Sequence, residues 1–233
     1  MRVLAVASEA VPLVKTGGLA DVVGALPEAL AAHGVAVTTL LPGYPMVMAA
    51  LAAGNEVARL DDLPGGPARI VAGHVGGWPF AVLDAPALFA RPGNPYLGPD
   101  GAEWPDNGLR FAALGAAAAR LATHGAGFDA VHAHDWQAGL AGAYLRHGGA
   151  RTPVLFTVHN LAFQGGFPAA LFAQLGLPAE AFALAGLEFH GGVGFLKAGL
   201  WYADAITTVS PTYAAEITTP EGGMGLDGLL AGR

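Results

Sequence analysis

The sequence contains no cysteine, which excludes disulfide bonds and catalysis by a thiol. It is also poor in charge: charged residues make up 12% of the chain, and the net charge is −7 with no basic run. Nucleic acids and anionic membrane surfaces bind clusters of basic residues, so we expect neither as a partner. A small anionic ligand is still compatible with this composition, because one lysine at a helix end is enough to bind it.

Long apolar runs are missing as well. No stretch approaches the roughly 18 uninterrupted apolar residues of a membrane span, and the alanine-rich segment 111–122 carries Arg120. The apolar start of the chain is interrupted by Ser8, Glu9 and Pro12, so we interpret it as a buried strand rather than a signal peptide. These features predict a cytoplasmic protein. Hydrophobic residues make up 53% of the 233 residues, and this predicts a large core.

Strand-like and helix-like patterns alternate along the chain. Apolar runs that are typical of buried parallel strands occupy residues 3–7, 35–41, 69–74, 80–83, 130–133, 153–158 and 205–209. Helical periodicity occupies residues 19–33, 108–123, 137–147, 168–184, 195–203 and 211–218, and Asp106 or Asn107 is the expected cap of the second helix. This alternation predicts an α/β fold with a Rossmann-like, doubly wound, mostly parallel sheet. We find no linker or repeat, so residues 1–233 are expected to form one domain.

The most distinctive polar residues follow the predicted strands. In doubly wound sheets, ligands bind beyond the carboxyl ends of the strands. Residues at those ends include Ser8, Glu9, Asp84, Asp135 and His159. The segment 85–105 is rich in proline and glycine and is long for a structureless loop, a property that is common in functional loops.

The first motif, Lys15-Thr16-Gly17-Gly18-Leu19-Ala20-Asp21, lies between a strand and a helix. Glycines allow a ligand to approach the backbone closely, a helix N-terminus attracts anions, and a lysine suits phosphate. The alternative is a simple glycine turn with a solvated Lys15, where Asp21 favours the helix dipole. The motif matches neither a P-loop nor the dinucleotide-binding glycine pattern.

The second motif is His132-Ala133-His134-Asp135-Trp136, in which the two histidines lie on the same face of a strand. Such a pattern is also found in metal sites, but no other histidine has a spacing that would complete one, so no metal is expected. A histidine that is packed and hydrogen-bonded within the sheet describes His132 better.

The third motif is Val158-His159-Asn160, whose two polar residues directly follow an apolar strand; its alternative role is strand capping and turn formation, which is common for Asn. Weaker candidates for substrate contacts are Glu9, Asp21, Tyr96 and Gln164. Tyr96 could stack on a sugar or a base, although aromatic residues in proline-rich loops more often serve packing.

Several segments resemble the glycogen and starch synthases of glycosyltransferase family 5. They are SEAVPLVKTGGLADVVGALPEAL at 8–30, LLPGYP at 40–45, RPGNPY at 91–96, VHAHDWQAGL at 131–140, FTVHNLAFQG at 156–165, GLEFHGGVGFLKAGLWYAD at 186–204 and TTVSPTYAAEI at 207–217. The resemblance implies the amino-terminal, acceptor-side half of a GT-B enzyme, whose two Rossmann-like domains face each other across a cleft. It further implies transfer of glucose from ADP-glucose to the non-reducing end of an α-1,4-glucan, with retention and without a metal or other cofactor.

The resemblance also implies roles for individual residues. Lys15 would contact the phosphates of the donor, and Gly17 and Gly18 would let the loop approach them. Asp135 would be an active-site carboxylate, and His159 would hydrogen-bond the transferred glucose; these two are the expected catalytic residues. Asn160 joins the weaker candidates as a substrate contact. No convincing nucleophile is present, so we expect an internal-return path rather than the two-carboxylate route of retaining glycosidases.

Members of this family are about twice as long, and their second domain supplies most of the nucleotide site. The chain ends at Gly228–Arg233, where the connection between domains would begin, so we expect the carboxyl-terminal nucleotide-binding domain to be absent and the isolated chain to be inactive. Two alternatives stay open. One is a glucan-binding module without catalysis, and the other is a GT-B transferase that uses another nucleotide sugar.

Overall fold

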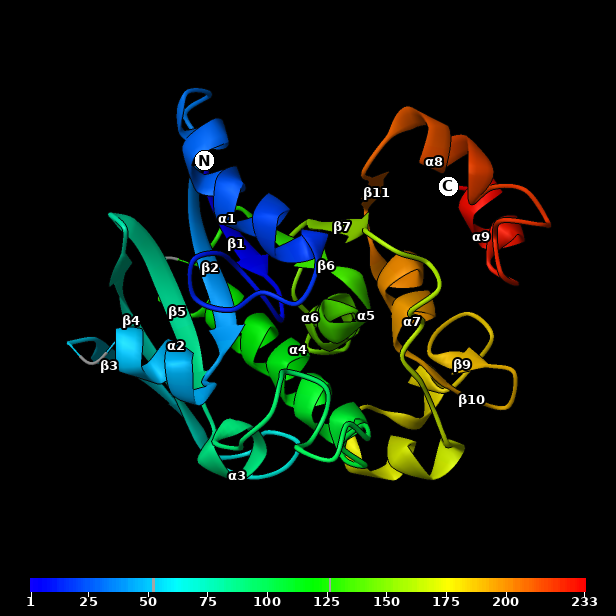
Figure 1. Ribbon diagram of the computed structural model, residues 1–233. Coiled ribbons are helices and arrows are strands. Elements are labelled where there is room, and N and C mark those ends of the chain that lie inside the picture. The colour runs from blue at the N-terminus through cyan, green and yellow to red at the C-terminus, as the bar shows by residue number, and fades with distance from the viewer. Residues whose placement is uncertain (52, 126) are drawn as a thin grey trace.

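An eight-stranded sheet forms the centre of the computed structural model, which describes residues 1–51, 53–125 and 127–233 (Figure 1). The strand order is β11-β7-β6-β1-β2-β5-β4-β3, and the pairs from β11 to β5 are all parallel, whereas β4 runs antiparallel to β5 and β3. The strands are β1 Arg2–Val6, β2 Ala36–Pro42, β3 Asn55–Leu60, β4 Ala68–Val75, β5 Trp78–Asp84, β6 Ala130–His134, β7 Val154–Val158 and β11 Ala205–Thr208. The predicted α/β class and mostly parallel sheet are confirmed.

Helices cover both faces of this sheet. They are α1 Gly18–Ala31, α2 Pro45–Ala50, α3 Pro86–Phe89, α4 Asn107–Thr123, α5 Asp135–Ala138, α6 Ala141–His147, α7 Phe195–Tyr202, α8 Pro211–Glu216 and α9 Asp227–Ala231. Side chains of β1 alternate between two buried layers. Leu4 and Val6 belong to the main core, together with α4, while Val3 and Ala5 belong to a smaller cluster that Leu30 of α1 covers. Within the described residues, no helix is both long and apolar enough to cross a membrane.

One predicted helix is wrong. Residues 168–184 form two short 3₁₀ helices, Ala169–Gln174 and Ala179–Ala181, instead of one α-helix. Gly176 has a positive φ of 66°, which ends the first turn, and Pro178 lacks the N–H that a continuing helix would need. The predicted helix 137–147 is also divided, into α5 and α6, around Gly139.

Some elements are too short for periodicity to reveal. A three-stranded sheet has the order β8-β10-β9, and its strands are Gly166–Phe167, Gly192–Gly194 and Glu188–Phe189. The cap of α4 is at Asp106, as predicted, but its side chain makes no capping hydrogen bond. The Asp106 carboxylate instead pairs with both terminal nitrogens of Arg91, at 2.7 and 2.6 Å, and this ties the segment between α3 and α4 to the start of α4.

Candidate active site

Three neighbouring strands, β7, β6 and β1, bring the predicted site residues to one edge of the sheet. Glu9 follows β1, Asp135 follows β6, and His159 follows β7. The chain leaves β1 toward β2 on one side, while β6 pairs with β1 on the other side, so the strand order reverses here. Crevices at such a reversal are the usual ligand sites of open α/β sheets.

Glu9 shapes the loop that leads into α1. Its side chain is buried, with 2% exposed, and its carboxylate accepts hydrogen bonds from the Thr16 backbone N–H, the Thr16 hydroxyl and, at 3.4 Å, the Gly17 N–H. The Tyr96 hydroxyl donates to the same carboxylate. Glu9 is therefore occupied by protein donors and holds the loop in place; a direct contact with substrate remains a prediction.

Lys15 and Asp21 form an ion pair at 2.7 Å beside the first turn of α1. About half of each side chain is exposed, 52% for Lys15 and 54% for Asp21, so solvent screens the pair and the lysine is free to exchange partners. The helix begins after Gly17, which has no side chain to cap it. This end of α1 thus combines backbone N–H groups, the positive end of a helix dipole and a lysine, a combination suited to a phosphate.

Gly17 and Gly18 are open toward solvent. A Cβ atom built on either residue would meet nothing within 4 Å among the described residues, and neither residue has the positive φ that favours glycine. Neither crowding within the fold nor backbone strain accounts for the two glycines. A ligand that lies against the backbone would account for them.

Tyr96 reaches the site from the long segment between α3 and α4. Its hydroxyl lies 2.8 Å from the Ser8 hydroxyl and also contacts Glu9, while its ring packs 6.0 Å from the ring of Phe111 and 6.5 Å from that of Trp136. Burial raises the pKa of Tyr96, so its hydroxyl stays protonated and acts as a donor. The geometry supports the packing alternative: Tyr96 braces the loop through Glu9.

Asp135 stands at the junction of β6 and α5 with a positive φ of 55°, an uncommon conformation for a residue other than glycine. One oxygen of its carboxyl group accepts the His159 backbone N–H at 2.7 Å. Burial raises the pKa of Asp135 to about 7, and Glu9 adds to this rise, although hydrogen bonds from the backbone of His159 and Asn160 oppose it. The group therefore titrates near neutral pH, as functional carboxyl groups often do.

Three histidines form a row beneath this edge. The His132 ring stacks on the His134 ring with 4.0 Å between centroids, and His132 Nε2 lies 2.6 Å from the Thr157 hydroxyl, which confirms that His132 is hydrogen-bonded within the sheet. His134 Nδ1 lies 3.0 Å from His159 Nε2. Burial lowers the pKa of His132 and of His159 to about 4, and lowers that of His134 as well. All three imidazoles are neutral at pH 7.

Two weaker candidates are engaged in local structure. The Asn160 side chain accepts the Ala162 N–H at 3.0 Å, a turn that matches the alternative role of this residue. The Gln164 side chain donates to the Met224 carbonyl at 3.1 Å, which ties the strand region to the loop before α9. Neither contact excludes a substrate, and their roles as substrate contacts stay predictions.

Arg110 supports the site without having been predicted. It is buried inside α4, with 1% exposed, and donates to the carbonyls of Leu88 and Pro95 and to the side chain of Asn107. Asn107 in turn donates to the Tyr96 carbonyl at 3.0 Å. These bonds shape the segment that carries Tyr96. An arginine within the otherwise apolar stretch 108–119 is the signal that could have identified it.

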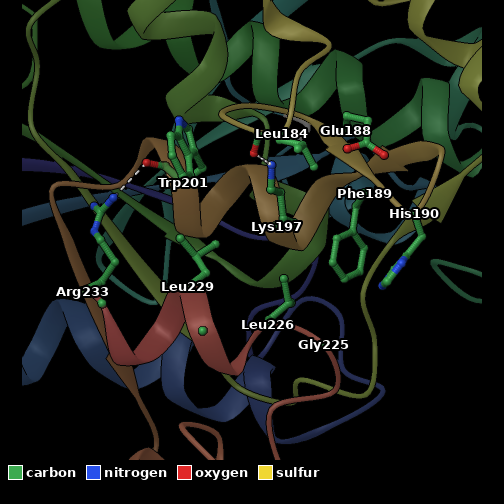
Figure 2. Close-up of a pocket in the computed structure, with 12 residues that line it drawn as sticks. Leu184, Glu188, Phe189, His190, Lys197, Trp201, Gly225, Leu226, Leu229 and Arg233 are labelled. Atoms are coloured by element: carbon green, nitrogen blue, oxygen red, sulfur yellow. Dashed lines mark hydrogen bonds between the residues drawn. The ribbon is translucent and has the colours of Figure 1, made fainter. Parts of the chain in front are cut away.

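A cavity of about 680 Å³ lies elsewhere, between α7, the β9 region and α9 (Figure 2). Leu226, directly before α9, and Leu229 of α9 face Phe189 and Trp201 across it, and Lys197 donates to the Leu184 carbonyl. None of the predicted site residues lines this cavity. The candidate site is instead the open edge of the sheet beside α1.

Known proteins resemble this chain in sequence and in fold. The family model for the starch synthase catalytic domain matches residues 2–232. The chain is 60% identical over its whole length to a glycogen synthase of Novosphingobium aromaticivorans and 61% identical to one of Acidiphilium cryptum. Its fold is similar to the catalytic domain of Starch Synthase IV from Arabidopsis thaliana, bound to ADP and acarbose, with a TM-score of 0.82 and 29% identity over 99% of the chain. The chain spans about half the length of these relatives, 50% of both glycogen synthases and 49% of the plant enzyme.

Proposed function

The chain belongs to the starch synthase catalytic domain family, and we propose that it provides one half of a glycogen synthase that transfers glucose from ADP-glucose to the non-reducing end of an α-1,4-glucan. The observation that carries the proposal is the identity of about 60% to glycogen synthases over the full length of the chain. The structure of a more distant relative, bound to ADP and acarbose, supports a nucleotide and a glucan-like sugar as ligands.

In this proposal the start of α1 receives the donor. Lys15 leaves Asp21, 2.7 Å away, and pairs with the diphosphate of ADP-glucose. Gly17 and Gly18 allow the diphosphate to lie against the backbone, because no side chain of either residue occupies that space. Glu9 and Tyr96 do not contact the donor in this proposal; they hold the loop in the shape that receives the phosphates.

His159 and Asp135 act at the transferred glucose. A neutral His159 hydrogen-bonds a glucose hydroxyl and so fixes the position of the anomeric carbon. Asp135 holds the His159 backbone at 2.7 Å, and its carboxyl group, when ionised, favours positive charge at the reacting sugar. The bond from the anomeric carbon to the phosphate oxygen breaks, and a bond to the acceptor 4-hydroxyl oxygen forms on the same face. The departing phosphate takes the hydroxyl proton, so configuration is retained without an enzyme nucleophile.

The half of the relatives that this chain does not match has a role in the proposed reaction as well. We propose that this half binds most of the nucleotide and completes the charge stabilisation at the diphosphate, so that the 233 residues alone do not transfer glucose at a useful rate. The carboxyl-terminal GT-B domain is therefore an expected partner, in addition to ADP-glucose and α-1,4-glucan.

The test is transfer of radiolabelled glucose from ADP-glucose to glycogen by this chain, with and without a separately expressed carboxyl-terminal half of the Novosphingobium aromaticivorans enzyme. Activity only in the mixture is expected. Activity of the chain alone would overturn the division of labour, and a mixture active only with another nucleotide sugar would overturn the donor. If maltooligosaccharides raise the melting temperature and no mixture transfers glucose, the chain is a glucan-binding module instead.

A further inference from the structure

His134 occupies a position that the proposed reaction does not use. Its side chain is completely buried, with 0% exposed, between the rings of His132 and His159. Its Nδ1 atom lies 3.0 Å from Nε2 of His159, within hydrogen-bonding distance. His134 therefore touches a proposed catalytic residue from the side of the core, where no substrate has access.

The hydrogen between these two rings is bonded either to Nδ1 of His134 or to Nε2 of His159, because each neutral imidazole carries one N–H. If His159 donated, His134 would carry its own hydrogen on Nε2. That atom is buried and has no hydrogen-bond partner in the described part of the chain. Among buried backbone groups, an N–H without an acceptor is rarer than an acceptor without a donor, and we apply the same preference to the imidazole nitrogen. The surroundings therefore favour a hydrogen on Nδ1 of His134, donated to His159.

The position of this hydrogen fixes the tautomer of His159. Because its Nε2 accepts the hydrogen bond, the single hydrogen of its neutral ring must be on Nδ1. The backbone of His159 is held separately, through its N–H and the Asp135 carboxyl group at 2.7 Å. His134 thus orients the ring, while Asp135 orients the main chain.

We propose that His134 is a positioning residue, which donates a hydrogen bond from Nδ1 to Nε2 of His159 and so keeps His159 in the tautomer with hydrogen on Nδ1. This inference rests on the proposed function for its role in transfer. A ring held in one tautomer presents one fixed N–H donor to a hydroxyl oxygen of the bound glucose. A ring free to change tautomer or to rotate would present that donor only part of the time.

The tautomers are measured directly by long-range ¹H–¹⁵N NMR of the chain with ¹⁵N-labelled histidine at pH 7. Variants in which one histidine at a time is replaced assign the signals to residues. We expect hydrogen on Nδ1, and a bare Nε2, for both His134 and His159. A hydrogen on Nε2 of His159 would overturn the proposal. This measurement needs no substrate and no catalysis, so it is independent of the proposed function.

Two substitutions then test the role in transfer, in the mixture of both halves. His134→Asn places an amide N–H where Nδ1 stands, and we expect it to keep the tautomer of His159 and a kcat within about twofold of the wild type. His134→Phe removes the donor, and we expect a mixture of His159 tautomers and a kcat lowered about tenfold or more, with KM for glycogen little changed. His124→Asn, at an exposed histidine, is the control.

The outcomes separate the two ideas. If the wild-type mixture transfers glucose and His134→Phe keeps the full kcat per folded molecule, the positioning role is wrong and the proposed function stands. If the wild-type mixture transfers none, the role in transfer falls with the proposed function, while the NMR result still decides the tautomer.

Discussion

At Asp135 three properties meet in one residue: a positive φ, a buried carboxyl group and a hydrogen bond to the backbone of His159. The positive φ and the burial of the carboxyl group are each unfavourable for folding, whereas the hydrogen bond stabilises the fold. Their combination directly beside a proposed catalytic histidine is typical of functional sites, so we expect Asp135 to be kept for function rather than for stability.

The pKa values of this residue and its neighbours predict how stability depends on pH. His132 and His159 have folded pKa values of about 4, below those of the unfolded chain, so the stability that they contribute is lost as the pH falls from about 6.5 to 4. Asp135, with a folded pKa of about 7, has the opposite effect: its ionisation lowers stability as the pH rises from about 4 to 7. The histidines outnumber Asp135, so urea unfolding should show a less stable wild type at pH 4.5 than at pH 6.5.

Asp135→Asn removes the opposing contribution and keeps an acceptor for the His159 N–H. The variant should be more stable than the wild type at pH 8 and equally stable near pH 4. Its free energy of unfolding should therefore rise more steeply with pH between these values. Equal stability of both proteins at pH 8 would show that the carboxyl group ionises at its ordinary pKa.

Lys15 is the residue whose removal should affect activity without affecting the fold. Lys15→Ala removes one charge-assisted contact to the diphosphate, worth about 1.5–3 kcal/mol, and should lower kcat/KM for ADP-glucose about ten- to a hundredfold in the mixture of both halves. Its melting temperature should hardly change, because the pair with Asp21 is half exposed. Arg120→Ala breaks a similarly exposed pair with Asp62 and is the matched control. An unchanged kcat/KM for Lys15→Ala would refute the phosphate role.

At the scale of the element, α1 carries glycines in two different surroundings, one open and one crowded. Gly18 begins the helix and faces open space, whereas a Cβ atom at Gly24 would lie 2.3 Å from Cγ2 of Val11 and 2.7 Å from its carbonyl oxygen. The two positions look alike in the sequence. Their surroundings separate a glycine kept for packing from one that packing does not require.

Substitution by alanine should separate the same two roles. Gly18→Ala should change the free energy of unfolding by no more than about 1 kcal/mol, yet raise KM for ADP-glucose, because the methyl group occupies the space proposed for the diphosphate. Gly24→Ala should destabilise the chain by about 1–3 kcal/mol through overpacking. Gly228→Ala, which also faces open space, should alter neither quantity. Normal donor KM for Gly18→Ala would argue against a ligand at this turn.

At the scale of the whole molecule, the order of the strands makes the site. β1, β6 and β7 are far apart in sequence but adjacent in the sheet, and this brings Glu9, Asp135 and His159 to a single edge. In the His132–Asp135 motif, His132 Nε2 contacts Thr157, whereas His134 Nδ1 and one carboxyl oxygen of Asp135 contact His159, so these atoms do not converge on a common point. In the described ranges no group of three or more His, Asp or Glu side chains is arranged to hold a metal ion.

We therefore expect that EDTA leaves glucose transfer by the mixture of both halves unchanged. Transfer before and after dialysis against the chelator measures this, with a metal-dependent hydrolase as the positive control. Complete inhibition that zinc restores would mean that the histidine motif binds a metal after all.

The sequence by itself determined the α/β class, most strands and the positions of Glu9, Asp135 and His159 after strands, because apolar periodicity and strand termini are local properties. It also identified the family, because motifs typical of that family are spread over the whole chain. Only the tertiary structure decided which polar groups form hydrogen bonds with one another. Tyr96 contacts Glu9 across 87 residues and His134 contacts His159 across 25, and such pairings depend on strand order and packing, which no local pattern encodes.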